Sequence, residues 1–436
     1  MGYLRGGQRV QLKNSDKIRS RSCRDGYRGV EPRGYVCAGK HTTFDGRDSR
    51  LLAWRTVQPR AGAFPFEYAI SNNTPMYRWV PTPERWARAE RAFGAAGKFP
   101  KYLWHEKHER LAEERTIPVN GALPEVWLKS RGRLVDRRAH LGSMFGFTRS
   151  FAHQDRTWLL SADGTAVPAD RVRPYRQSRF EGVELQGRSL RPGGWAQKKT
   201  VAWLRDGDGG FRQTPTHWPK RAWVPYFDEP GHADLRGQNS RGLPGPGYRK
   251  TTRVHTDGAA LWVRANQLRE VIVPRRTPVG TGPVERWVQV SIGRGVLVAM
   301  AGERAVFATL ISPGMGGLPR RAVDPVKAST TPLGSFRIVH KYRFKTMTPQ
   351  GAKPERDRTF FIADVPFAQF FEGPFALHTA YWHDDFGELM SGGCVNLSPL
   401  DGERLFRFTE PRLPVGWHSV SAGGSNGLGT RVVIVR

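Results

Sequence analysis

A histidine and a cysteine near the C-terminus have the types and spacing of a thiol nucleophile and its base. His378 precedes Cys394 by sixteen positions, and the cysteine follows the turn Ser391-Gly392-Gly393. A thiol is weakly ionised at neutral pH, and an imidazole within hydrogen-bond reach can take its proton. Because glycine tolerates positive φ, the N–H groups of Gly393 and Cys394 can face one point and stabilise an oxyanion. The pattern predicts acyl transfer through a thioester.

The same stretch resembles the signature of the L,D-transpeptidase (YkuD-type) catalytic domain, which is a histidine, a spacer, then Ser/Thr-His-Gly-Cys-x-Arg/Asn. The positions that fit are Ser391, Gly393, Cys394 and Asn396. Gly392 departs from the signature, because the family usually has histidine there, and an attenuated or inactive variant therefore stays open. The segment from Thr330 to Phe336 is similar to the family's Thr-Pro-x-Gly-x-Phe motif. The resemblance covers about residues 284–436.

The resemblance assigns the catalytic positions. Cys394 matches the nucleophile, His378 the general base, and the carbonyl of Thr379 the group that orients the imidazole, so that no carboxylate is needed to complete a triad. Substrate contacts are expected from the residues that surround these positions in the sequence: Ser391, Asn396, His383, Tyr381 and Trp382.

The residues alone leave alternatives to these roles. His383 is a rival base to His378, or it faces substrate or packs. Ser391 either bonds across the turn or is merely small and polar, and Asn396 either fixes the loop or binds a substrate carboxylate. A metal site made by both histidines and Cys394 has the spacing of no familiar zinc pattern. We therefore expect neither a metal nor a cofactor.

The stretch from Gly373 to Glu403 contains no Lys or Arg, although it holds Asp384, Asp385 and Glu388. In a chain with a net charge of +30, this local acidity is unusual. We hypothesise that it attracts the cationic side-chain amine of an acceptor peptide.

The other two cysteines, Cys23 and Cys37, lie close together near the N-terminus. A disulfide between them would close a loop of about 15 residues and contribute up to about 3 kcal/mol. Such a bond implies an oxidising compartment. The alternative is a pair of reduced, unconnected thiols.

The positive charge is concentrated outside the C-terminal region. Residues 284–436 carry 18 Lys and Arg against 13 Asp and Glu, so residues 1–283 carry 51 against 26 and a net charge of +25. A basic surface suits an anionic partner such as an envelope surface, or it is simply solvated. The chain has no Cys/His finger, aromatic RNA-binding signature or dense basic arm, so nucleic acid is not expected. We expect a monomer.

The composition predicts several folded, mainly β domains. With 436 residues, 38% of them hydrophobic, the chain is too long for one core. We expect a small β-barrel-like module at 1–50, a mixed segment with helices at 51–144, β-rich and possibly duplicated small barrels at 145–275, a linker at 276–283 and a catalytic domain at 284–436. The resemblance implies a β-sandwich with short helices for the last of these.

The N-terminus lacks the apolar core of a signal peptide, so it gives no indication of the location. The expected location therefore comes from the resemblance alone. A cell-wall enzyme belongs in the periplasm or cell envelope, and this sequence would then be a mature form. The implied function is peptidoglycan cross-linking or protein attachment, with a part in cell wall biogenesis and cell shape, through a thioester with stem tetrapeptides. The alternatives are an L,D-carboxypeptidase and a catalytically attenuated wall-binding scaffold.

Overall fold

The computed structural model describes residues 2–13, 17–94, 117–122, 124–129, 132–185, 192–227, 236–238, 244–347 and 361–436. It is mostly β, as the sequence predicts. The chain divides into two compact units. Unit 1 is Met1–Phe180, Arg337–Asp384 and Leu397–Gly429, and unit 2 is Glu181–Phe336, Asp385–Asn396 and Thr430–Arg436. Each unit collects separate stretches of chain.

Among the described residues, helices are few and short. They are α1 (Ser49–Arg55), α2 (Pro83–Glu90) and α4 (Pro399–Phe408), with 3-10 turns η1 (Arg91–Phe93), η2 (Glu125–Trp127), η3 (Ala169–Arg171), η4 (Ala265–Gln267) and η5 (Gly424–Asn426). Helix α2 begins as its sequence predicts, with Thr82 as N-cap, Pro83 in the first turn and Glu84 at the positive end of the dipole. Part of the segment expected to be mixed, residues 95–116, lies outside the described residues. None of the helices described is long and apolar enough to cross a membrane.

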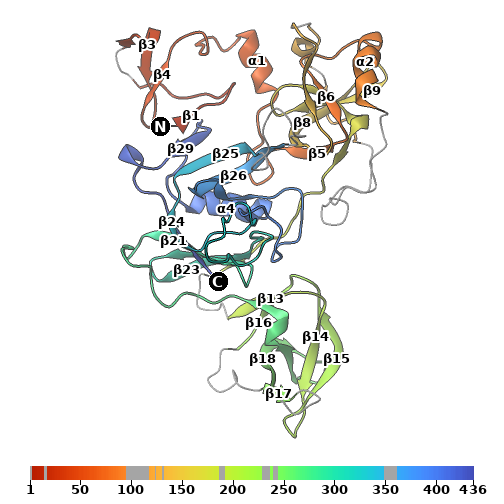
Figure 1. Cartoon of the computed structure of the whole chain (residues 1–436), viewed down its shortest axis with the longest axis vertical. Coiled ribbons are helices and arrows are strands. Elements are labelled where there is room, and N and C mark those ends of the chain that lie inside the picture. The colour runs from red at the N-terminus through yellow and green to blue at the C-terminus, as the bar shows by residue number, and fades with distance from the viewer. Residues whose placement is uncertain are drawn as a thin grey trace. The chain divides into compact units, whose positions relative to one another are not determined.

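Unit 1 is built on a 13-stranded sheet. Its main path is β1 (Gly2–Tyr3), β29 (Ser419–Ser421), β25 (His340–Met347), β26 (Ile362–Glu372), β8 (Met144–His153), β9 (Arg156–Ser161), β10 (Ala166–Pro168), β6 (Thr74–Tyr77) and β7 (Val135–Ala139), and it is joined by β5 (Glu67–Ser71), β11 (Val172–Pro174), β27 (Phe375–Thr379) and β28 (Val395–Leu397). Helix α4 packs against β26 and β27 (Figure 1). The C-terminal strands therefore share a sheet with strands from the first 180 residues.

Helix α4 starts where its sequence requires. The Oγ of Ser398 accepts a hydrogen bond from the N–H of Asp401 at 3.2 Å, and Pro399 occupies the first turn. The second turn touches β27 so closely that a Cβ on Gly402 would lie 2.1 Å from Oγ1 of Thr379. Only glycine fits there, and the contact fixes the strand that carries His378.

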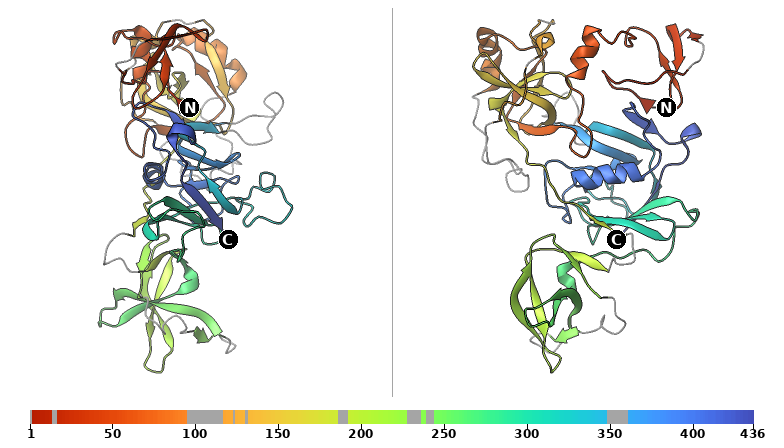
Figure 2. Two further views of the ribbon diagram at one scale, coloured as in Figure 1. Left: turned by 90° about the vertical axis from the view of Figure 1, so that its left-hand side faces the viewer. Right: turned by 180° about the vertical axis from the view of Figure 1, so that it is seen from behind.

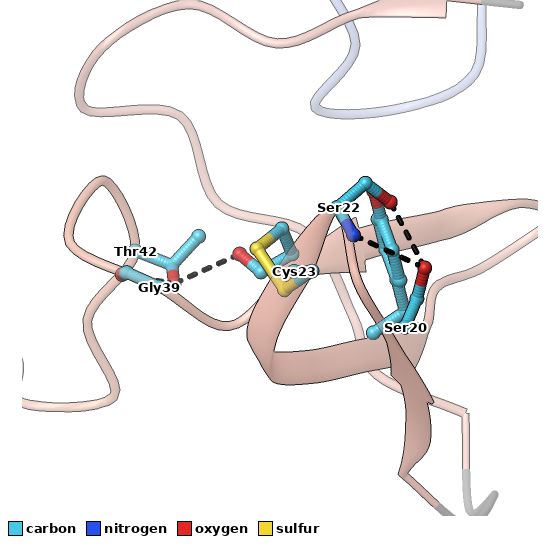
Figure 3. Close-up of a disulfide and its surroundings, with 7 residues drawn as sticks. Ser20, Ser22, Cys23, Gly39 and Thr42 are labelled. Carbon is cyan, nitrogen blue, oxygen red and sulfur yellow. Dashed lines mark hydrogen bonds between the residues drawn. A yellow bond between two sulfur atoms is a disulfide. The ribbon is translucent and has the colours of Figure 1, made fainter.

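The N-terminal cysteines lie on neighbouring strands. Strands β2 (Ile18–Ser20), β3 (Cys23–Gly29) and β4 (Tyr35–Cys37) form an open three-stranded sheet, rather than the barrel-like module expected for residues 1–50. A disulfide joins Cys23 to Cys37 (Figure 3). The hydroxyl of Thr42 donates to the carbonyls of Cys37 at 3.1 Å and Gly39 at 2.9 Å, which holds the chain beyond the bond.

Unit 2 contains a six-stranded sheet and two smaller ones. The first runs β12 (Val183–Glu184), β23 (Arg304–Leu310), β22 (Val296–Ala301), β21 (Arg286–Ser291), β30 (Arg431–Val435) and β24 (Gly334–Arg337). The antiparallel meander of β21, β22 and β23 agrees with the alternation of apolar runs and turns in the sequence. The C-terminal strand β30 adds to it in parallel, with Val290 opposite Ile434.

The smaller sheets come from residues 193–270, which we call the accessory module. They run β16 (Trp223–Pro225), β13 (Gly193–Ala196), β20 (Leu268–Glu270), and β15 (Phe211–Trp218), β14 (Thr200–Arg205), β19 (Ala260–Arg264), β18 (Pro244–Val254), β17 (Arg236–Gln238). Figure 2 shows β14, β15, β18 and β19 side by side in green. Within the described residues these are open sheets, not closed barrels. Their tryptophans are mainly core residues, and Trp195 is 1% exposed.

The two segments proposed as a duplication share one local order of elements. A strand, an Asp-Gly turn, a second strand, a 3-10 turn and a third strand occur as β9, β10, η3, β11 and again as β18, β19, η4, β20. Gly164 and Gly258 both have positive φ, 81° and 84°, which explains the glycine in each turn. The first copy lies in unit 1 and the second in unit 2, so residues 145–275 do not form one domain.

Candidate active site

The cysteine turn lies in unit 2 and is closed by Ser391. Its Oγ accepts a hydrogen bond from the N–H of Gly393 at 3.0 Å and donates to the carbonyl of Cys394. Of the two roles left open for Ser391, the structure therefore gives it the bond across the turn. Cys394 is partly exposed and is the cysteine outside the disulfide. Cys394 therefore lies on a turn that is stabilised by hydrogen bonds between its own residues.

The segment that begins at Ser312 supports this turn from one side. The carbonyl of Pro313 accepts from the N–H groups of Met390 at 3.0 Å and Ser391 at 3.1 Å, and the N–H of Met315 donates to the carbonyl of Ser391 at 2.8 Å. Ser312 and Asn396 exchange two backbone hydrogen bonds of 2.9 Å. The cysteine turn is therefore paired with residues 312–315 both before and after Cys394.

The Thr-Pro motif supports the same segment from its other side. The N–H of Gly314 donates to Oγ1 of buried Thr331 at 2.9 Å, and the N–H of Gly316 donates to the carbonyl of Ser329 at 3.0 Å. A Cβ on Gly314 would lie 2.3 Å from that same carbonyl, so the approach requires glycine. The Thr-Pro motif and the cysteine turn are thus both hydrogen-bonded to the segment 312–316, which lies between them.

The candidate base, His378, lies on β27 in unit 1 and is 3% exposed. Its Nδ1 donates to the carbonyl of Thr379 at 3.1 Å, which leaves Nε2 as the proton acceptor. Burial lowers the pKa of His378 to about 4, and the hydrogen bond to Thr379 opposes this only in part. The imidazole is therefore neutral at pH 7, as a base must be.

The backbone segments that follow His378 and Cys394 are hydrogen-bonded to each other. The N–H of Ala380 donates to the carbonyl of Leu397 at 2.9 Å. Ala380 follows His378 by two positions, and Leu397 follows Cys394 by three. The sequence neighbours of the two candidates are thus fixed to each other in the sheet of unit 1.

Comparisons with known proteins give this region a family. Residues 275–434 match the family model described as the L,D-transpeptidase catalytic domain, YkuD. Residues 275–434 form a YkuD domain. No curated protein matches the chain.

Similar solved structures include an L,D-transpeptidase from Stackebrandtia nassauensis at 20% identity and a TM-score of 0.23, covering 36% of this chain and 58% of that one. A second, from Xylanimonas cellulosilytica, has 22% identity and a TM-score of 0.22, with 37% of this chain and 65% of that one covered. L,D-transpeptidase 3 from Mycobacterium tuberculosis has 16% identity and a TM-score of 0.26, with 56% and 96% covered. The chain thus spans less than two thirds of the first two relatives.

The expected substrate contacts after His378 lie mostly in the interior of the YkuD domain. Tyr381 is 1% exposed, stacks on Tyr68 at 3.6 Å between ring centroids, and donates its hydroxyl to the carbonyl of Ala363. It is a core residue rather than a substrate contact. His383 is also 1% exposed. Trp382 is partly exposed and its ring lies 6.0 Å from that of His378, so it alone of the three stays near the base with an accessible surface.

Two further expectations change in the structure. The N–H of Gly393, expected in the oxyanion hole, donates to Ser391, so it must exchange this partner before it can bind an oxyanion. Asn396 is 1% exposed and pairs through its backbone with Ser312, which agrees with a loop-fixing role more than with a substrate contact.

The acidic stretch of the YkuD domain is not available to an acceptor amine in the way we hypothesised. Asp385 pairs with Lys220 at 2.9 Å and Glu388 with Arg269 at 3.1 Å, while Asp384 accepts from the hydroxyl of Ser178. Two of these three carboxylates, Asp385 and Glu388, are thus paired with cations from the accessory module. The hypothesis of an acidic patch that attracts an amine is therefore contradicted for Asp385 and Glu388, and it stays a prediction for Asp384.

Arg269 was not expected from the sequence as part of the site. It lies on β20 and also donates to the carbonyl of Arg294 at 3.1 Å, and a Cβ on Gly387 would lie 2.8 Å from its Nε. It therefore holds the loop that leads to Cys394 at more than one point. The sequence offers no signal for this, because Arg269 stands 125 positions before the cysteine in a chain rich in arginine.

We expect Gly392→His to restore the family residue without loss of stability. A Cβ at Gly392 meets no atom within 4 Å, and the position is exposed. The free energy of unfolding should change by less than about 0.5 kcal/mol in urea titrations. Gly393→Ala is the matched control, because Gly393 has φ of 124° and should lose about 1–3 kcal/mol. Equal losses at both positions would contradict this account of the turn.

The protein should lose stability as the pH falls from about 6.5 to about 4. Burial lowers the pKa of both His378 and His418 to about 4 from 6.5. In that window the unfolded chain binds more protons than the folded one, so protonation favours unfolding, by up to about 3 kcal/mol for each residue. Urea midpoints at pH 7 and 4.5 measure the loss. His418→Asn should reduce it, whereas the exposed His217→Asn should not.

Proposed function

We propose that the YkuD domain is a cysteine-dependent L,D-transpeptidase that acts on peptidoglycan stem peptides. The observation that carries the proposal is the partly exposed residue Cys394, on a turn closed by Ser391 and paired with residues 312–315. The neutral imidazole of His378, oriented by the carbonyl of Thr379, supplies the matching base. The family match supports this choice of chemistry over other thiol reactions.

In the first half-reaction, the sulfur of Cys394 attacks the carbonyl carbon of the peptide bond between an L-centre and the terminal D-alanine of a stem tetrapeptide. His378 takes the thiol proton through Nε2 as the S–C bond forms. The tetrahedral intermediate collapses with breakage of the C–N bond. His378 then gives the proton to the leaving amine, and free D-alanine departs.

In the second half-reaction, an acceptor amine attacks the thioester. His378 accepts a proton from this amine, the new C–N bond forms, the C–S bond breaks, and the proton returns to Cys394. The product is a cross-link or an attached protein. Water in place of the amine gives an L,D-carboxypeptidase. No cofactor takes part in any of these steps.

The hydrogen bond from Gly393 to Ser391 favours a second candidate, a wall-binding scaffold with attenuated catalysis. If the bond persists when substrate binds, the oxyanion keeps only one of the two amides. Removal of an oxyanion-hole donor costs about 10²–10³ in rate in acyl transfer. An enzyme with this turn is therefore slow unless Ser391 reorients.

We place the protein in the cell envelope or periplasm. The Cys23–Cys37 disulfide supports an oxidising compartment. The net charge of +25 over residues 1–283 favours an anionic envelope surface as a second partner. Both proposals are tested by fractionation of cells that make the protein.

Intact mass spectrometry tests the enzyme. Incubation with a carbapenem should add one drug mass to the folded protein, and incubation with a tetrapeptide donor should release D-alanine. Addition of an amine acceptor should divert the product from the hydrolysed peptide to the amide. A folded protein that gains no drug mass and releases no D-alanine contradicts the enzyme and leaves the scaffold.

A further inference from the structure

Unit 2 contains a polar cavity of about 340 Å³ between the accessory module and the loop that leads to Cys394. Its lining includes Gln197, Lys198, Arg264, Gln267, Arg269 and Glu388. The first five come from the turn after β13 and from the stretch that runs from the end of β19 through η4 into β20, and Glu388 stands six residues before Cys394. The cavity therefore joins a module of unknown role to the chain segment that carries the candidate nucleophile.

The cavity has an excess of positive charge. Arg269 is neutralised by Glu388 at 3.1 Å. Lys198 and Arg264 have no carboxylate partner within the described part of the chain. Two cations thus face a space that contains one ion pair, and an anion is the ligand that balances them.

Part of the cavity wall is held in place before any ligand binds. The guanidinium of Arg264 lies 4.2 Å over the ring of Trp203, and its Nε donates to the hydroxyl of Tyr248 at 3.1 Å. The amide nitrogen of Gln197 donates to the carbonyls of Asn266 at 3.1 Å and Leu268 at 3.2 Å. A fixed guanidinium suits a planar carboxylate, because the two groups can form paired hydrogen bonds.

The wall also offers a hydrogen-bond acceptor. The side-chain oxygen of Gln267 is buried and has no hydrogen-bond partner among the described residues. A buried acceptor without a donor is costly, so a ligand with an N–H group gains by meeting it. A carboxylate next to an amide N–H is the arrangement found in a peptide. A phosphate polymer has no such donor, and a second negative charge would face Glu388.

We propose that this cavity binds a carboxylate-bearing portion of a stem peptide, with Lys198 and Arg264 as the ligands of the carboxylate. The inference rests on the proposed function for its ligand and adds a substrate-binding role for the accessory module. Because Glu388 belongs both to the cavity and to the loop before Cys394, an occupied cavity also stabilises that loop in the paired form described above.

Binding is best measured without turnover, in the full chain carrying Cys394→Ala. Isothermal titration calorimetry with a stem tetrapeptide is compared with the same peptide in which the carboxylates are converted to amides. We expect the amide form to bind roughly five- to tenfold more weakly, the scale of one charge-assisted hydrogen bond. Lys198→Gln should weaken binding of the free peptide by a similar factor. It should have little further effect on the amide form, because the two changes remove one interaction.

The neighbouring lysine provides the matched control. Lys199 is exposed like Lys198 but does not line the cavity. Lys199→Gln changes net charge equally, so it should reduce affinity only through the long-range field, by less than twofold. Arg264→Lys keeps the charge and should retain part of the affinity that Arg264→Gln loses.

Three results would overturn the inference. The first is an equal loss of peptide affinity in Lys198→Gln and Lys199→Gln, and the second is equal affinity of the protein with Lys198 intact for the free and the amidated peptide. The third is displacement of the peptide by inorganic phosphate at concentrations below those of the peptide, which would indicate a phosphate site. The carbapenem adduct of the wild-type protein separates the two proposals. If the adduct forms but the peptide binds without dependence on Lys198, the cavity is wrong and the enzyme stands.

Discussion

The Cys394→Ala variant is expected to gain no mass from a carbapenem and to release D-alanine at least about 10⁴-fold more slowly than the wild type. The reason is that the proposal routes both half-reactions through one sulfur atom. Cys23 and Cys37 cannot replace it, because the disulfide occupies both. Intact mass and a coupled D-alanine assay measure the two effects.

The loss of activity in Cys394→Ala can be assigned to the missing sulfur only if the variant folds like the wild type. Cys394 is partly exposed and its side chain is small, so we expect the urea midpoint of Cys394→Ala to match that of the wild type. Cys394→Ser keeps a nucleophilic atom and should behave like the alanine variant within tenfold, because a hydroxyl is ionised far less readily than a thiol. Carbapenem adduct on either folded variant would assign the chemistry to another residue.

The His378→Asn variant is expected to lower the rate of carbapenem acylation by about 10²- to 10⁴-fold. Asparagine can still donate to a carbonyl but accepts no proton at neutral pH. The pH dependence of the acylation rate gives a second test of this role. Because the pKa of His378 is about 4, the wild-type rate should rise with pH through that value as the imidazole becomes neutral, and then level off. The variant should lack this rise.

His383→Asn is the matched control for the base. Both histidines are buried, and they stand five positions apart. We expect less than a tenfold loss at His383. A larger loss there than at His378 would exchange the two roles and would also contradict the orienting bond to Thr379. Circular dichroism should accompany both variants, because each removes a buried ring.

The sequence predicted the parts of the site that depend on local chemistry. The glycine-rich turn before Cys394 follows from residue types a few positions apart, and the orientation of His378 by Thr379 was implied by the resemblance. The two Asp-Gly turns likewise depend on local chemistry, because Gly164 and Gly258 have positive φ. The relation between the Thr-Pro motif and the cysteine turn was visible only as a similarity, and Gly314 explains it in space.

The rest depends on contacts between residues far apart in the chain. Tyr381 looked available to substrate because it stands beside the base, but Tyr68 covers its ring in the core. The acidic stretch looked unpaired because the nearest cations in the sequence are distant, yet Lys220 and Arg269 meet it. Compact units assembled from separate stretches cannot be read from composition shifts, because such shifts report only on neighbours along the chain.

The ion pairs from Lys220 to Asp385 and from Arg269 to Glu388 limit how this protein can be cut or recombined. A fragment that starts at residue 284 would keep every residue of the family signature and leave both carboxylates without their counterions. Such an excised piece is a poor substitute for the whole in screening. Swapping the accessory module for that of a relative would succeed only if the new module brought two cations to the same places.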